Sequence, residues 1–166
     1  MDLSEQDLKK IKSLHVMLKM PIWILERETN RVLKSYKSIY KHPISYEFKE
    51  KNISDEVVRF YSGMLNEIFL CLWYQDVRIV IGAFRINNVT STEFSHVYDN
   101  LTPENKKILS EKECWEYYSS LPVYPLGDIR DYLILLGFLF DMNLEEIYSE
   151  ELHKQVGENQ LELVRK

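Results

Sequence analysis

The sequence predicts an α+β domain in which an antiparallel β-sheet is flanked by helices. Residues 67–86 form a long apolar β-hairpin pattern, residues 22–37 form a shorter one, and helical patterns lie before and after them. At 166 residues the chain is long enough for one domain with its own hydrophobic core. Hydrophobic residues make up 45% and charged residues 28%, which is ordinary globular composition.

The first predicted element is a helix over residues 3–19. Ser4 followed by Asp7 resembles a capping box with the shorter acid. Pro21 ends the helix because proline restrains the preceding residue away from helical geometry. The apolar stripe of this helix consists of Leu8, Ile11, Leu14 and Leu18.

A short hairpin follows, with strands over 22–25 and 31–37. The turn is expected at Glu28-Thr29-Asn30, because asparagine tolerates the left-handed conformation that such turns need. The polar stretch Ser38 to Asn52 is interpreted as an excursion or lid. Ser54 is expected to cap a short helix through about Leu65.

The second hairpin, residues 67–86, has its turn at Gln75-Asp76 and pairs Tyr74 with Val77. One predicted face is aliphatic core and carries Ile68, Leu70, Leu72 and Tyr74 against Val77, Ile79, Ile81 and Ala83. The other predicted face carries Phe69, Cys71 and Trp73 against Arg78, Val80, Gly82 and Phe84. Because this face is also largely apolar, either helices cover it or it floors a ligand cavity. Gly82 lets another group approach the strand backbone.

The pattern after the hairpin is helical. Thr102-Pro103-Glu104 is a helix start, and one helix or a pair of helices is expected through Tyr118. Residues 121–125 contain two prolines and are expected to be extended. Asp128 is expected to cap an apolar helix that includes Ile129, Tyr132, Leu133, Leu135, Leu136, Leu139 and Phe140. These residues occupy most of its circumference, so this helix is either central to the core or partly in an oligomer interface.

The last segment is expected to be helical from Asn143. Steps of four and three give it coiled-coil spacing, with an asparagine at a position that often fixes register. The candidate dimer contacts are Leu152, Val156, Asn159 and Leu163. A plain amphipathic surface helix is the alternative, which Gly157 favours because glycine weakens helices.

We therefore divide the chain into a sensor domain at 1–142 and a dimerisation or connector helix at 143–166, and we expect the natural protein to continue past Lys166.

Charge and motif content argue against several function classes. A formal net charge of −5 argues against direct nucleic-acid binding by this domain. The sequence has no glycine-rich phosphate loop, nucleophile elbow or helical histidine pair. We therefore expect no catalytic residue, cofactor or metal. The four histidines are dispersed: His15, His42, His96 and His153.

Cysteine usage and hydropathy indicate the compartment. Cys71 and Cys114 lie far apart and lack metal-ligand spacing, and Cys71 sits in an apolar run that suits a buried thiol. Together with the absence of a signal-peptide pattern, this predicts the reducing cytoplasm. The longest apolar run, residues 133–140, is too short for a membrane span, which needs about 20 residues.

Three stretches resemble a known family: Leu18–Ile22, Ile79–Phe84, and Leu121-Pro122 leading into Asp128-Ile129. With the order of elements, they resemble a PAS/GAF-type sensor fold and the N-terminal regulatory region of AraC-family transcriptional regulators from Gram-positive bacteria. These regulators often have proline after the strand glycine, where this chain has Ala83. The resemblance implies DNA contact through a separate helix-turn-helix region after Lys166.

The leading hypothesis is a ligand-sensing and dimerising domain of a bacterial transcription regulator, acting as a homodimer. A small effector would bind between sheet and helices and bias two arrangements of the terminal helix. Arg78 would pair with an anionic group of the effector; the alternative is a surface arginine stacked on Trp73. The candidate ligand-binding residues are Trp23, Tyr36, Phe69, Trp73, Arg78 and Phe84. The second hypothesis is a protein-interaction or dimerisation module without a small ligand, and a small enzyme is the third.

Overall fold

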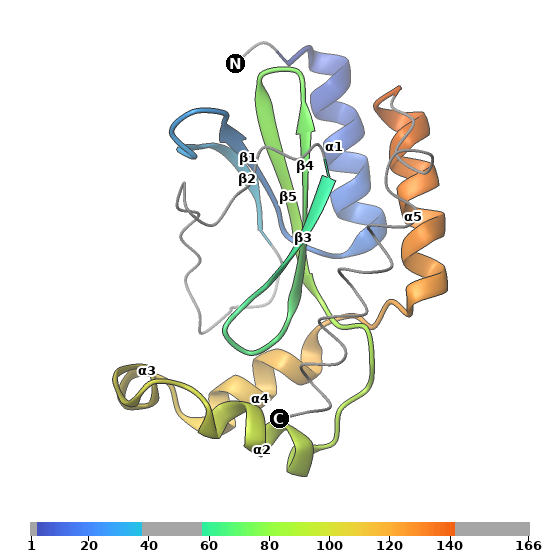
Figure 1. Cartoon of the computed structure of the whole chain (residues 1–166). Coiled ribbons are helices and arrows are strands. Elements are labelled where there is room, and N and C mark those ends of the chain that lie inside the picture. Colours follow the sequence, from blue (N-terminus) through green and yellow to red (C-terminus); the bar gives the residue numbers. More distant parts are fainter. Residues whose placement is uncertain (1–2, 38–57, 142–166) are drawn as a thin grey trace.

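A computed structural model describes residues 3–37 and 58–141 and shows a five-stranded antiparallel sheet flanked by helices (Figure 1). The predicted α+β class is confirmed. The sheet order is β2-β1-β5-β4-β3. The strands are β1 (Ile22–Glu26), β2 (Val32–Tyr36), β3 (Val58–Ser62), β4 (Ile68–Tyr74) and β5 (Val77–Phe84). The predicted lid at Ser38 to Asn52 and the predicted terminal helix, with its four dimer candidates, lie outside the described residues.

The hairpin of β1 and β2 forms where the sequence predicts it. Ile22 lies opposite Tyr36 and Trp23 opposite Ser35 in the antiparallel register. Asn30 has a φ of 59°, so it adopts the left-handed conformation expected of the turn. Strand β1 continues the sheet inward by pairing with β5.

The predicted helix from Ser54 to about Leu65 is wrong where the structure describes it. Residues 58–62 are strand β3, which pairs antiparallel with β4. Val58 and Phe60 alternate along the strand and are both buried. Pairing with the exposed edge of β4 satisfies the backbone groups of this segment and outweighs the weak helix signal.

The hairpin of β4 and β5 has the predicted turn, and Tyr74 pairs with Val77. Its faces differ from the prediction beyond Gly82, because the register shifts between Ile68 and Phe69. Phe84, rather than Ala83, lies opposite Ile68. A Cβ on Gly82 would lie 2.7 Å from the Phe69 ring, so the expected close approach to the glycine is made by a neighbouring side chain.

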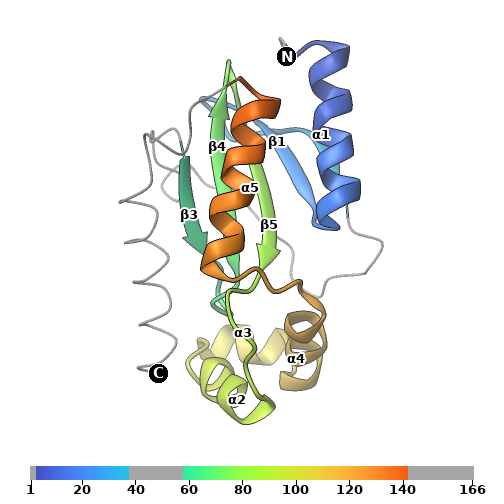
Figure 2. The same ribbon diagram turned by 90° about the vertical axis from the view of Figure 1, so that its right-hand side faces the viewer.

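Helices α1 (Glu5–Leu18) and α5 (Leu126–Leu139) pack on one side of the sheet, here called the first face (Figures 1 and 2). The predicted capping box of Ser4 and Asp7 is present. Helix α5 begins at Leu126, two residues before the predicted cap, and Asp128 lies in its first turn. The core of this face includes Ile11, Leu14, Ile24, Leu72, Ile79, Ile129 and Leu133.

Three further helices lie beyond one end of the sheet: α2 (Ser91–Asp99), α3 (Pro103–Ile108) and α4 (Glu111–Ser120) (Figure 1). From that end, helices α2 and α4 pack against side chains of the side of the sheet opposite α1 and α5, here called the second face. Its core includes Leu25, Phe69, Val80, Ala83, Phe94, Tyr117 and Tyr118. The predicted start at Thr102 and the pair of helices are confirmed, whereas α2 was not predicted.

Within 3–37 and 58–141, the structure has no helix that is long and apolar enough to cross a membrane.

Candidate functional site

The six predicted ligand-binding residues divide between the two faces of the sheet. Strand alternation and packing place four of them on the second face: Trp23, Phe69, Trp73 and Arg78. The other two, Tyr36 and Phe84, pack with the core of the first face. The prediction that Phe84 shares a face with Phe69 is wrong, because the register shift beside Gly82 reverses the alternation. The six residues therefore do not line one site.

On the first face, Tyr36 and Phe84 are part of aromatic packing. Tyr36 lies 5.8 Å from His15 between ring centres, and Phe84 lies 5.8 Å from Tyr124. A cavity of about 30 Å³ adjoins Phe84 beneath α5, with an almost wholly apolar lining. Pockets for small molecules usually measure about 300–1,000 Å³, so this cavity is too small for a metabolite in the observed form.

On the second face, Trp73 is the centre of a cluster of two arginines and an indole. The guanidinium carbon of Arg78 lies 4.0 Å from the centre of the Trp73 ring, and that of Arg27 lies 4.1 Å from it. Arg78 is only 4% exposed. The sequence suggested a surface arginine stacked on Trp73 as one alternative. Arg78 does stack on Trp73, but it is a buried cation and not a surface one. We call Arg27, Trp73 and Arg78 the arginine–tryptophan cluster.

The two positive charges of this cluster are close together. Distances of 4.0 and 4.1 Å to one ring centre place the guanidinium carbons at most about 8 Å apart, which corresponds to at least about 0.5 kcal/mol of repulsion in water and about 2 kcal/mol near a protein surface. Attraction of each cation to the indole is worth about 0.5–2 kcal/mol and offsets this repulsion. The cluster therefore brings two guanidinium groups to one indole ring.

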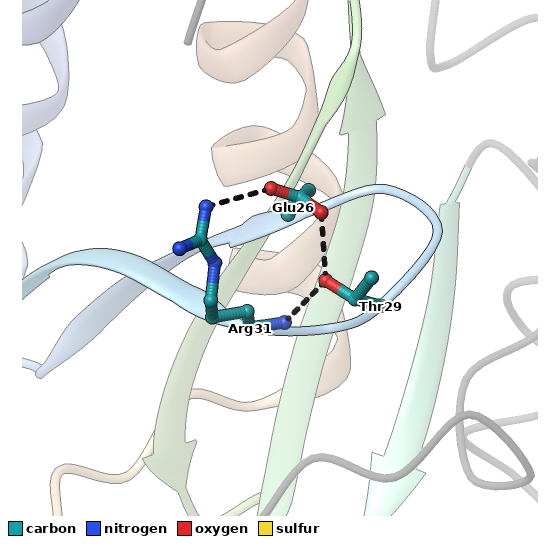
Figure 3. A network of polar contacts seen from close by, with 3 residues as sticks. All are labelled: Glu26, Thr29 and Arg31. Carbon is teal, nitrogen blue, oxygen red and sulfur yellow. Dashed lines mark hydrogen bonds and ion pairs between the residues drawn. The ribbon is translucent and has the colours of Figure 1, made fainter.

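The turn between β1 and β2, which carries Arg27, is stabilised by polar contacts among Glu26, Thr29 and Arg31 (Figure 3). Arg31 donates to the Glu26 carboxylate at 2.9 Å, and Thr29 donates to the other oxygen of Glu26 at 2.9 Å. The hydrogen bonds from Thr29 and Arg31 lower the pKa of Glu26, which keeps it charged. The acidic side chain next to Arg27 is thus bonded within the turn, while Arg27 contacts Trp73.

Sequence reasoning missed Arg27, because its contact with Trp73 depends on the pairing of β1 with β5 and on the turn after β1. Leu25 pairs with Arg78, and Arg78 pairs with Trp73, in one row across three strands. Arg27 lies one residue beyond the end of β1, in the turn, and reaches the same indole ring as Arg78.

The indole nitrogen of Trp73 adds a polar group to the cluster. Trp73 is 7% exposed, and its buried Nε1 has no hydrogen-bond partner among the residues that the structure describes. A buried donor without an acceptor costs about 1–3 kcal/mol. Trp23 and Phe69 lie on the same face with their ring centres 6.4 Å apart, so apolar surface lies beside these polar groups.

Glu67 is a second buried polar residue that the sequence did not indicate. It is fully buried at the start of β4 and accepts a hydrogen bond from the Leu65 amide at 3.1 Å. Burial raises the pKa of Glu67 to about 7, and the backbone hydrogen bonds only partly offset this. A Cβ on Gly63 would overlap the Glu67 carboxyl group, so any other residue there would require the Glu67 side chain to shift.

Arg85 joins the end of β5 to the helices at the end of the sheet. Its side chain donates to the Leu121 carbonyl at 3.0 Å and to the Ser119 carbonyl at 3.2 Å. Its backbone bonds to Pro122 and Tyr124, so the extended connector predicted at 121–125 runs beside it. This arginine therefore fixes the path from β5 to α4 and α5.

The cysteines do not provide a nucleophile. Burial raises the pKa of Cys71 to about 12, and burial also raises the pKa of Cys114. Both thiols therefore stay protonated at neutral pH. Across the described ranges, no three His, Cys, Asp or Glu side chains come together as a metal site.

Comparisons of the chain with protein-family models, with curated proteins and with solved structures gave no match. The α+β fold and the chemistry of the second face are therefore the basis for a proposal about function.

Proposed function

We propose that this chain is a PAS/GAF-like sensor domain of a cytoplasmic transcription regulator, which binds a small effector on the second face of its sheet. The observation that supports this most is the arginine–tryptophan cluster. Sites for small molecules combine apolar and aromatic surface with a few placed polar groups. Arg27, Trp73 and Arg78 supply the polar groups, and Trp23 and Phe69 supply the aromatic surface.

The burial of Arg78 supports binding rather than simple packing. Moving a guanidinium group out of water is costly, and apolar residues of similar volume often stabilise a core better than buried ions do. A buried arginine in the middle of a β-sheet therefore favours a role beyond stability. Arg78 also lies on β5, the strand along which we propose that the signal passes.

In this proposal, the signal passes along β5. Arg78 lies near the start of this strand, and Arg85 follows its end. Arg85 in turn holds the connector that leads into α5. The signal path needs two arrangements of β5 and α5. An effector that binds one arrangement more tightly than the other would shift the equilibrium between them by that difference in affinity. DNA contact is delegated to a separate domain, in keeping with the acidic charge of this chain.

The test is a screen of a metabolite library against the full chain by thermal unfolding, followed by native mass spectrometry of each hit. An effector that binds only the folded state raises the unfolding temperature. We expect the hits to lose their effect in Trp73→Phe or Arg78→Met chains that still fold, as judged by circular dichroism. If no compound raises the unfolding temperature, or if hits act equally on the variants, the proposed site is wrong.

A protein-interaction or dimerisation module is the second candidate, and one observation favours it. Phe138 on α5 is 83% exposed, and Val16 and Met17 on α1 are also largely exposed. Both helices lie on the same side of the sheet (Figure 2). Exposed apolar side chains on one layer are typical of an interaction surface. A second copy of this chain is the partner we propose.

A further inference from the structure

We infer that the cavity beneath α5, on the first face of the sheet, binds the end of a short aliphatic chain. This site is separate from the arginine–tryptophan cluster, which lies on the opposite face. It therefore goes beyond the proposed effector site and does not depend on it. Three features carry the inference: the apolar lining of the cavity, its size, and the two half-buried tyrosines at its edge.

The lining of the cavity is almost wholly apolar. Phe60, Leu70 and Ile81 line it from the sheet, and Ile129 and Leu136 line it from α5. All five side chains are buried. A buried water molecule needs about two to four polar partners, which such a lining does not offer. An apolar group is the better occupant, because it gives the lining the dispersion contacts that a void cannot supply.

The size of the cavity fits the end of a chain and not a whole molecule. About 10–15 Å³ is enough for a group as large as a water molecule, so a cavity of about 30 Å³ has room for about two such groups. A methyl or methylene group is only slightly larger than water. The cavity therefore accepts about the last two carbons of an aliphatic chain and leaves the rest of the ligand outside.

Tyr124 and Tyr132 form the edge at which a chain enters. Both are half-buried, whereas the other side chains that line the cavity are buried. The two ring centres lie 4.7 Å apart in an edge-to-face contact, and the Tyr124 hydroxyl donates to the Leu18 carbonyl at 3.0 Å. Because this hydrogen bond holds Tyr124 in place, we expect the Tyr132 side chain to turn outward and admit the chain.

A chain bound in the cavity contacts α5 directly. Ile129, Tyr132 and Leu136 follow one another along this helix, which packs on the sheet beside α1, and all three line the cavity (Figure 2). Tyr124 belongs to the connector before α5 and bonds through its backbone to Arg85. The bound chain therefore adds contacts between α5 and the sheet, and it stabilises the packed position of the helix.

The experiment follows the isoleucine methyl signals of the full chain by ¹³C NMR during titration with n-hexanol and with hexanoate. Each signal is assigned from an isoleucine-to-valine variant. We expect the signals of Ile81 and Ile129, which line the cavity, to shift saturably. Those of Ile11 and Ile24, which belong to the same core but do not line the cavity, should move less. Tighter binding of n-hexanol identifies a neutral head group, and tighter binding of hexanoate identifies an anionic one.

Hexanediol with a hydroxyl at both ends is the matched control ligand. It has the same chain length as n-hexanol, but either end would place a hydroxyl without a partner in the apolar cavity. We expect it to bind at least about tenfold more weakly than n-hexanol. Equal binding of the two compounds would show that the cavity does not hold the chain end, and the inference would be wrong.

Leu136→Phe is the main variant, and Leu135→Phe is its matched control. Both add the same volume to α5, but Leu136 lines the cavity, whereas Leu135 is half-buried and does not. We expect Leu136→Phe to weaken binding of n-hexanol about tenfold or more and Leu135→Phe to change it by less than about twofold. Circular dichroism checks that both variants fold.

Leu136→Ala is a second variant that keeps the test decisive if the larger side chain prevents folding. It enlarges the cavity, so we expect it to bind n-hexanol about threefold or more tightly than wild type does. Affinity that is the same in wild type, Leu136→Phe and Leu136→Ala would overturn the inference. So would shifts of equal size at all isoleucines, which would mean general binding to apolar surface. None of these results bears on the arginine–tryptophan cluster, where effector binding is judged by Trp73→Phe and Arg78→Met.

Discussion

Glu67 makes the stability of the chain depend on pH in a direction that is unusual for a carboxylate. Burial raises its pKa from an ordinary value of 4.5 to about 7, so the folded chain binds the proton more tightly than the unfolded chain does. Stability is therefore greatest below pH 4.5 as far as this group is concerned, and falls as pH rises towards 7. The full loss is about 3 kcal/mol.

Glu67→Gln tests this dependence, because glutamine resembles the protonated acid and still accepts from the Leu65 amide. We expect the variant to match wild type at pH 5 and to exceed it by about 2–3 kcal/mol at pH 8. Urea unfolding of both chains at the two pH values measures the difference. An equal fall in stability from pH 5 to pH 8 in both chains would show that Glu67 stays ionised or does not titrate in this range.

At the residue scale, the sequence predicted the conformation of individual residues better than their environment. Asn30 in the left-handed region and the capping box at Ser4 follow from local chemistry and are confirmed. The burial of Arg78 and Glu67 was not predictable in this way, because it depends on which elements cover the second face. The contact of Arg27 with Trp73 was not predictable either, because it depends on the pairing of β1, β5 and β4.

At the scale of the elements, Arg85 joins α4 to β5. Its side-chain hydrogen bonds to Leu121 and Ser119 tie the end of α4 to β5. Hydrogen bonds from charged donors are worth about 1.5–3 kcal/mol, so Arg85→Met should loosen this junction by a similar amount. We expect faster hydrogen exchange at the amides of 117–124 and little change in β1 and β4, because local opening is confined to one cooperative unit.

Hydrogen exchange followed by mass spectrometry measures this effect, with Arg31→Gln as the control for loss of one arginine charge. Uniformly faster exchange across the sheet would mean that Arg85 stabilises the whole fold. Unchanged exchange at 117–124 would mean that the junction is held by the backbone bonds of Pro122 and Tyr124 alone.

At the element scale, strong patterns were predicted correctly and weak ones were not. The long hairpin of β4 and β5 was predicted with its turn, because two runs of apolar residues meet at Gln75-Asp76. β3 was missed because the pairing with β4 that defines it is non-local. α2 was missed although Thr90 caps it by accepting from the Glu93 amide, a local signal that the sequence contains.

At the scale of the whole molecule, the α+β class was predictable because hairpins and helical periods occupy separate parts of the chain. The position of a site was not, because one shift of register beside Gly82 moved Phe84 to the first face. A one-residue shift reverses every later side chain of a strand. The six candidates were therefore identified as aromatic and charged residues of the sheet, but not as one group.

Exposed apolar side chains on α1 and α5 lead to the prediction for the whole molecule, a dimer through this layer. Phe138 is 83% exposed, and a two-fold interface uses the same patch on both copies. In such a dimer Phe138→Ser removes one buried side chain from each copy. Each is worth about 2 kcal/mol, so the dimer is weakened about a thousandfold. We expect sedimentation velocity to show a wild-type dimer and a Phe138→Ser monomer.

Ile108→Ser is the matched control, because Ile108 is 77% exposed on α3, outside this layer. It should leave the dimer intact, since a general loss of surface hydrophobicity would affect both variants equally. A dimer that persists in Phe138→Ser but dissociates in Ile108→Ser would place the interface on α3. A monomeric wild-type chain would remove the dimerisation module as a candidate and leave effector binding on the second face as the function to test.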